Sequence, residues 1–133
     1  MKTPRWISPL FVVAALYDGV LGLMFLAAPG ALFRLFAVMP PNHPGYVQFP
    51  AALLLIFGLM FAAVARDPNA NRNLIVYGIA LKAAYCGVTG WYWISSDIPG
   101  MWKPFVVIDL VMGLLFVWAY SVLTSSSERK GIA

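Results

Sequence analysis

Four apolar runs, each about as long as a membrane is thick, dominate the sequence. They cover about residues 8–28, 46–65, 73–94 and 102–124. A helix needs about 20 apolar residues to cross a hydrocarbon core of about 30 Å. Turn-forming prolines, glycines and asparagines separate the runs, so each is expected to be one helix. The predicted fold class is all-α: an integral membrane four-helix bundle that forms a single transmembrane domain over residues 1–133.

The composition supports lipid as the solvent for this bundle. Hydrophobic residues make up 62% of the chain and charged residues 11%, and the mean hydropathy is +0.81. A soluble domain carries about 25% charged residues. The nine Lys and Arg residues are scattered among helix ends and form no patch, which argues against nucleic acid as a partner. Cys86 is the single cysteine, which excludes an internal disulfide and a metal site built from cysteines.

The first run also has a feature of a signal peptide, because Lys2 and Arg5 precede it. Its length and the presence of Asp18 at its middle argue against that interpretation. The end of the run also lacks a small residue at the spacing that cleavage requires. The run is therefore expected to stay in the protein as a helix.

Basic residues in the flanks predict the orientation. Six lie on the side shared by the N-terminus, the second loop and the C-terminus, and two lie on the other side. Cytoplasmic flanks of membrane proteins carry the excess of Lys and Arg. Both termini are therefore expected in the cytoplasm (N-in/C-in), with the protein in the cytoplasmic (inner) membrane of a bacterium. The six are Lys2, Arg5, Arg66, Arg72, Arg129 and Lys130, and the two are Arg34 and Lys103.

Residues 31–38 form a short apolar segment around Arg34 that is too short to span a bilayer. We expect a short helix in the outer interface, with its rings in the acyl boundary and Arg34 towards the phosphates; the same segment could equally cap the outer end of the bundle. The indole rings of Trp91, Trp93 and Trp102 gather at the same end. They are predicted to be interfacial anchors that contact lipid headgroups.

Asp18, Lys82 and Asp109 are charged residues within the spans. Each costs about 2.5–3.5 kcal/mol to insert, so such groups face the bundle interior and pair with one another. A rise of 1.5 Å per residue puts Asp18 about 15 Å, Lys82 about 13–14 Å and Asp109 about 22 Å from the inner boundary. Asp18 and Lys82 are therefore expected to pair. Removing Asp18 alone would then strand a buried ammonium group.

Asp109 has no charged partner at its own predicted depth. The stem of Lys82, a water molecule, or the side chains of Tyr85, Tyr92 or His43 could reach it. Two carboxylates and one ammonium carry an excess negative charge, so we expect one carboxyl group to be protonated at neutral pH. Together with Tyr85 and Tyr92, the three charged residues form the predicted buried polar cluster and candidate ligand or proton site.

No catalytic motif accompanies this cluster, so no catalytic residues are assigned and an enzyme is not expected. His43 is the only histidine and has no cysteine near it, which argues against a metal site. No cofactor is predicted, although a quinone or a lipid could bind between the helices.

The function predicted from the sequence is an accessory subunit or binding protein within a membrane complex. Its expected partners are membrane lipids and either other transmembrane subunits or further copies of the chain. A small proton-coupled transporter using Asp18 and a quinone- or lipid-binding redox subunit are the alternatives. A fourth interpretation is an Asp–Lys pair that only fixes the order of the helices.

A set of short motifs supplies a family resemblance. They are Tyr17-Asp18-Gly19 in the first run, Pro29-Gly30 after it, Ala65-Arg66-Asp67-Pro68 after the second, Lys82 in the third and Asp109 in the fourth. In this combination, over about residues 8–122, the chain resembles the DoxX-like small bacterial four-helix membrane proteins. The resemblance implies a four-helix bundle that acts as a subunit. Some relatives are subunits of quinone-linked oxidoreductases and others help membrane proteins assemble, but no quinone-binding residue can be matched in this chain.

Overall fold

Four long helices make up most of the protein, whose computed structural model describes residues 3–132. They are α1 (Ile7–Ala27), α3 (Gly45–Arg66), α4 (Arg72–Ser95) and α5 (Lys103–Ile132). All four are long and apolar enough to cross a membrane, and no strand occurs in the described part of the chain. The predicted all-α, multi-pass membrane architecture is therefore confirmed. The predicted bounds lie within one residue of the observed ones except at the end of α5.

The predicted end of α5 lies several residues before the observed one. The helix continues from the expected end at residue 124 to Ile132. The expectation followed the apolar run, but a helix needs no lipid to continue, and Glu, Arg and Lys favour helix in water. The Nε atom of Arg129 also donates a hydrogen bond to the Ser125 carbonyl, 3.4 Å away, in this polar extension.

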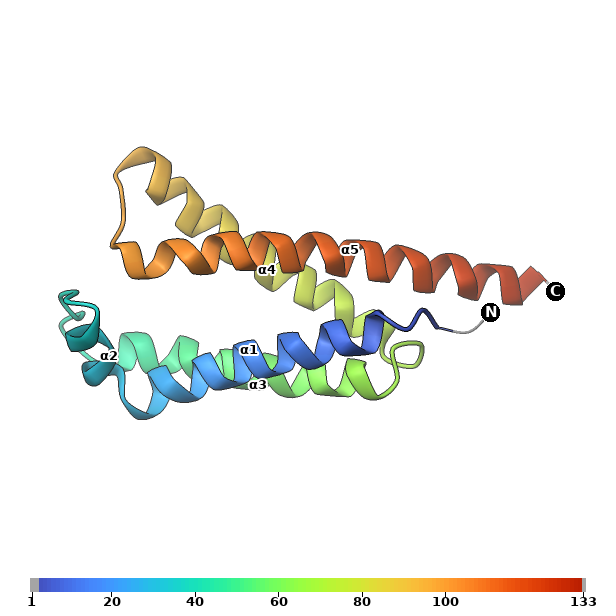
Figure 1. Cartoon of the computed structure of the whole chain (residues 1–133), viewed down its shortest axis with the longest axis horizontal. Helices are drawn as coiled ribbons and strands as arrows, with labels where there is room; N and C mark the ends of the chain where they lie inside the picture. Colours follow the sequence, from blue (N-terminus) through green and yellow to red (C-terminus); the bar gives the residue numbers. More distant parts are fainter. Residues whose placement is uncertain (1–2, 133) are drawn as a thin grey trace.

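The helices associate as two antiparallel pairs, α1 with α3 and α4 with α5 (Figure 1). Glycine lets the backbones of the first pair touch. A Cβ atom on Gly22 would lie 2.6 Å from the carbonyl oxygen of Ala51, and one on Gly58 would lie 3.0 Å from the backbone of Gly19. The backbones of the first pair are therefore in direct contact around Gly19 and Gly22 of α1.

The second pair is more open. Helix α4 crosses α5 obliquely, and α3 and α4 diverge from the turn that joins them (Figure 1). At the crossing, Gly113 of α5 faces the stem of Lys82, because a Cβ atom on this glycine would lie 3.2 Å from the lysine Cβ. Both termini lie at the same end of the bundle (Figure 1). We call this end the inner end, because the charge pattern predicts that it faces the cytoplasm.

Side chains of the α3–α4 turn hold these two helices together at the inner end. The Oδ1 atom of Asp67 accepts a hydrogen bond from the N–H of Ala70 at 3.0 Å. The Nδ2 atom of Asn71 donates to the carbonyls of Ala63 at 2.9 Å and Asp67 at 3.1 Å. The last carbonyl groups of a helix lack partners within the helix, so these bonds stabilise the end of α3.

Two short elements close the outer end of the bundle: the helix α2 (Pro29–Leu35) and the 3-10 turn η1 (Gly100–Trp102). Leu32 and Phe33 of α2 are buried and pack in one cluster with Met101 of η1. The helix predicted at residues 31–38 is observed at Pro29–Leu35, and its apolar side chains pack against this end of the bundle.

The residues predicted to be interfacial differ in their exposure. Arg34, Trp91 and Trp93 lie on the surface. Trp102 is instead half-buried, and its indole ring stacks on Phe25 with the ring centroids 5.7 Å apart. Trp102 therefore belongs to the packing at the outer end of the bundle.

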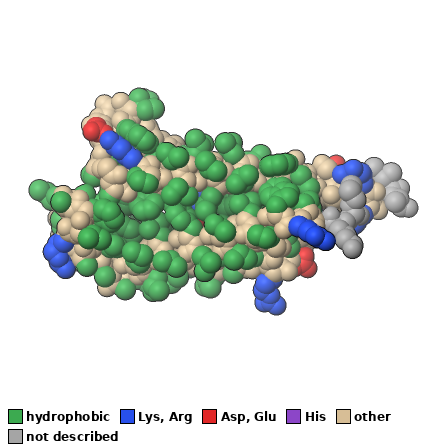
Figure 2. Space-filling view, in the orientation of Figure 1, with side chains coloured by type: hydrophobic (Ala, Val, Ile, Leu, Met, Phe, Trp, Pro, Cys, Tyr) green, Lys and Arg blue, Asp and Glu red, His purple; other side chains and the backbone are tan. Residues whose placement is uncertain are grey.

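Three phenylalanines fill the inner half between the two helix pairs. Phe11, Phe61 and Phe116 are fully buried, with ring centroids 4.8–6.0 Å apart. We call these three residues the phenylalanine cluster. Outside this core, hydrophobic side chains cover the middle of the molecule, and most charged ones lie towards its ends (Figure 2). This is the surface expected of a protein whose middle contacts lipid.

Candidate functional site

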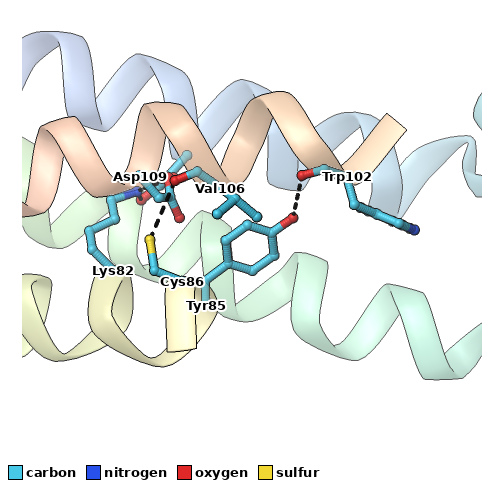
Figure 3. A network of polar contacts seen from close by, with 7 residues as sticks. Lys82, Tyr85, Cys86, Trp102, Val106 and Asp109 are labelled. Carbon is cyan, nitrogen blue, oxygen red and sulfur yellow. Dashed lines mark hydrogen bonds and ion pairs between the residues drawn. The ribbon is translucent and has the colours of Figure 1, made fainter. Parts of the chain in front are cut away.

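One lysine joins both intramembrane carboxylates. The Nζ atom of Lys82 lies 3.0 Å from Oδ1 and 3.0 Å from Oδ2 of Asp18, and 3.0 Å from Oδ1 of Asp109. All three residues are buried. The predicted Asp18–Lys82 pair is confirmed, and of the partners considered for Asp109, the lysine reaches it (Figure 3). We call these three residues the ion cluster.

The depth assigned to Asp109 from the helical rise did not foresee this contact. The rise per residue gives the distance of a residue from the inner end of its own helix. Depths on two helices can be compared in this way only if the helices are parallel and end at the same level. In this protein α4 crosses α5 obliquely, and α5 extends beyond the predicted inner boundary (Figure 1). The long lysine stem covers the remaining distance, because it runs from α4 across the face of Gly113.

The ion cluster leaves one oxygen atom unused. An ammonium group has three N–H donors, and Lys82 directs them to three carboxylate oxygens. The Oδ2 atom of Asp109 makes no hydrogen bond within the described residues, and the Asp109 side chain is 10% exposed whereas that of Asp18 is 1% exposed. Two carboxylates and one ammonium group sum to a formal charge of −1. The free oxygen and the greater exposure both belong to Asp109.

Two aromatic rings lie close to the ammonium group of the ion cluster. The Lys82 Nζ atom lies 5.2 Å from the ring centroid of Tyr17 and 5.9 Å from that of Phe61. A cation near an aromatic face is attracted by the ring quadrupole. Phe61 belongs to the phenylalanine cluster, so the ion cluster is closed towards the inner end by fully buried rings.

On the outer side, the ion cluster borders a cavity of about 370 Å³. Small-molecule sites in proteins have volumes of about 300–1,000 Å³ and are mostly apolar with few polar groups. This cavity has that character, since Asp18 and Asp109 are the only charged residues among those that line it. The other twelve are Tyr17, Leu21, Phe25, Tyr46, Val47, Pro50, Leu54, Leu81, Ala84, Tyr85, Trp102 and Phe105.

The cavity opens sideways between α3 and α4. Its lining residues on these helices include Tyr46, Pro50 and Ala84, which are themselves exposed on the outside of the bundle. The helices diverge at this point (Figure 1), while α2 and η1 cover the outer end. A molecule dissolved in the hydrocarbon could therefore enter from the side without crossing either headgroup layer.

Other residues predicted for the cluster have different contacts. Tyr85 lines the cavity, and its hydroxyl donates a hydrogen bond to the Trp102 carbonyl at 3.2 Å (Figure 3). Tyr92 is 54% exposed and lies outside the ion cluster. His43 accepts a hydrogen bond from the N–H of Gly45 at 3.0 Å, which fixes the start of α3. No group of metal-ligating residues occurs in the described part of the chain.

Tyr17 is the site residue that the sequence did not single out. It lines the cavity, its ring contacts the Lys82 ammonium, and its hydroxyl is buried with no hydrogen-bond partner among the residues that the structure describes. A signal was present, because Tyr17, Leu21 and Phe25 follow one another at intervals of four residues. This spacing places them on one helix face next to Asp18.

Fold and site together define a multi-pass α-helical membrane protein with a buried Asp–Lys–Asp ion cluster beside a laterally open cavity. No family model, curated protein or solved structure matches the chain. The resemblance to DoxX-like proteins accordingly stays a hypothesis that rests on the sequence motifs.

Proposed function

We propose that this chain is a small cytoplasmic-membrane protein that binds a small amphiphilic molecule between its helices. The ligand enters from the lipid between α3 and α4, its apolar body fills the cavity, and its polar head lies against the ion cluster. The observation that carries this proposal is a cavity of about 370 Å³ with two buried carboxylates in an otherwise uncharged wall.

Energetics favour a site over a purely structural ion pair. Three buried charges cost several kcal/mol of desolvation, and apolar residues of similar volume often stabilise a bundle equally well. A helix-ordering pair also needs no cavity beside it. In this chain both carboxylates line a cavity. If the cavity binds a ligand, contact between its polar group and a carboxylate offsets the desolvation cost of the buried charges.

An accessory-subunit role is compatible with this proposal, because a subunit can hold a lipid or quinone for a larger complex. A proton-coupled transporter is the second candidate. Asp18 lines the cavity on one side of the ion cluster, and the phenylalanine cluster closes the other side. Transport would require these rings to separate, and Asp18→Asn would then abolish uptake without unfolding the protein.

Photolabelling in lipid vesicles tests the binding role. The probe is 3-trifluoromethyl-3-phenyldiazirine, a small neutral molecule that dissolves in bilayers. We expect saturable labelling of cavity residues such as Tyr85 and Phe105, mapped by mass spectrometry. Diffuse labelling of all lipid-facing positions, without saturation, would contradict the proposal.

Two neighbouring alanines on α4 provide matched variants. Ala84 lines the cavity, whereas Ala83 lines a separate groove of about 170 Å³ between α4 and α5. Ala84→Phe should abolish the saturable labelling because its ring occupies the cavity, and Ala83→Phe should leave it unchanged. Equal effects of both substitutions would mean that the labelled site is not the cavity.

The proposed orientation has its own test. With Cys86 replaced by Ala, single cysteines are introduced as Ser127→Cys at the inner end and Met39→Cys in the outer loop. A membrane-impermeant maleimide added to intact cells should label the second and spare the first. The opposite pattern would place both termini outside the cytoplasm.

A further inference from the structure

The imbalance of charge in the ion cluster identifies the class of ligand more narrowly than the cavity does. Asp18, Lys82 and Asp109 sum to −1, and no other charged residue lines the cavity in the described part of the chain. An uncompensated charge in a medium of low dielectric constant is unfavourable. A proton on one carboxyl group balances it in the free protein, and a bound cation would balance it equally.

The polar atoms left without a partner beside the cavity suit a ligand whose head group donates hydrogen bonds. Lys82 has no N–H left to offer, since all three face carboxylate oxygens. Within residues 3–132, the Oδ2 atom of Asp109 is a free acceptor, and the hydroxyl of Tyr17 is buried without a partner. Once the balancing proton has left, the Asp109 carboxylate can only accept, so a ligand that replaces the proton must supply hydrogen.

The cavity wall suits a cation with an apolar body. Six of its fourteen lining residues are aromatic: Tyr17, Phe25, Tyr46, Tyr85, Trp102 and Phe105. Aromatic faces attract cations and pack well against rings and alkyl chains. Asp109 also lines the groove between α4 and α5. None of the described residues that line this groove is aromatic, and its volume is less than half that of the cavity.

We infer that the cavity selects a monovalent organic cation, a protonated amine on an apolar body, whose ammonium group binds the free oxygen of Asp109. This inference rests on the proposed binding function and deepens it. The ligand replaces the proton that neutralises the ion cluster, so the site is neutral both when empty and when occupied.

Competition against the photolabel tests this inference with two probes. They are 4-phenylbutylamine, which is a cation at neutral pH, and 4-phenylbutanol, which has a neutral hydroxyl group in place of the ammonium group. We expect the amine to displace the label at a concentration at least about tenfold lower than the alcohol, a ratio that corresponds to about 1.4 kcal/mol. Probe concentrations are corrected for partitioning into vesicles without protein.

Asp109→Asn removes the excess charge and leaves the Asp18–Lys82 pair intact. This variant should lose the preference for the amine and bind the alcohol as the native chain does. Equal or stronger competition by the alcohol in the native protein would overturn the inference, and this measurement needs no variant to fold. Saturable labelling that neither probe displaces would overturn it too and leave the binding function standing. Absence of saturable labelling would instead refute the proposed function.

Discussion

Replacing the single cation of the ion cluster is the most informative perturbation. Lys82→Met removes three hydrogen bonds of 3.0 Å to two buried carboxyl groups and takes away the positive charge of the cluster. Removing one partner of a buried ion pair costs about 3–5 kcal/mol, because the charge that remains has no partner. We expect a loss of this size in the free energy of unfolding at neutral pH. The loss should shrink as the pH falls, since protonated carboxyl groups need no counter-charge.

The two aspartates should behave differently from the lysine. Asp18→Asn and Asp109→Asn each leave one carboxylate and one ammonium group, so the charges stay balanced and Lys82 keeps a carboxylate partner. The expected loss is about 1.5–3 kcal/mol, the contribution of one hydrogen bond to a charged group. Combining both with Lys82→Met gives an uncharged site and should recover most of the stability lost in the lysine variant.

Reversible unfolding by sodium dodecyl sulfate in mixed micelles, followed by far-ultraviolet circular dichroism, measures these differences. Lys103→Met is the matched control, because Lys103 pairs with the exposed Asp97 in the outer loop. Such surface pairs contribute little to stability. If Asp18→Asn destabilised the protein as much as Lys82→Met, charge balance could not be what makes the lysine critical, and the reasoning would be refuted.

Further predictions concern the packing of α1 and the outer turn. Gly22→Ala should destabilise the protein by about 1–3 kcal/mol through overpacking, because the added Cβ would lie 2.6 Å from a carbonyl oxygen of α3. Gly87 has open space around it, so Gly87→Ala should be neutral or stabilise α4 by up to about 1 kcal/mol. The same unfolding assay measures both effects. Lys103 and the N–H of Ile98 hydrogen-bond to Asp97 and hold its pKa below the usual range. Lys103→Met should move that pKa up towards about 4, measured by NMR titration. Because the folded-state pKa is the lower one, the stabilisation is present above about pH 4 and is lost as the pH falls through the folded-state pKa; an unchanged pKa in the variant would exclude the ion pair as the cause.

The structure revises one expectation about stability. With only Asp18 and Lys82 at one depth, loss of Asp18 would strand the ammonium group. Asp109 lies 3.0 Å from the same Nζ atom, so the lysine still has a partner and the single change should be tolerated. The lysine is the critical residue because it is the one cation that the two anions share within the described chain.

The sequence by itself determined the four membrane-crossing helices, their bounds to within one residue at seven of eight ends, and the identity of the three buried charges. These follow from local properties: the length of an apolar run, the turn residues that end it, and the cost of a charge in lipid. The tertiary structure alone decided that Asp109 meets the same lysine as Asp18, because contact between α4 and α5 depends on an oblique crossing that no single helix encodes. It also decided that Tyr17 and Trp102 line a cavity, since open space arises only where α3 and α4 diverge. The intramembrane charges are therefore a sequence property, and the site that they form is a property of helix packing.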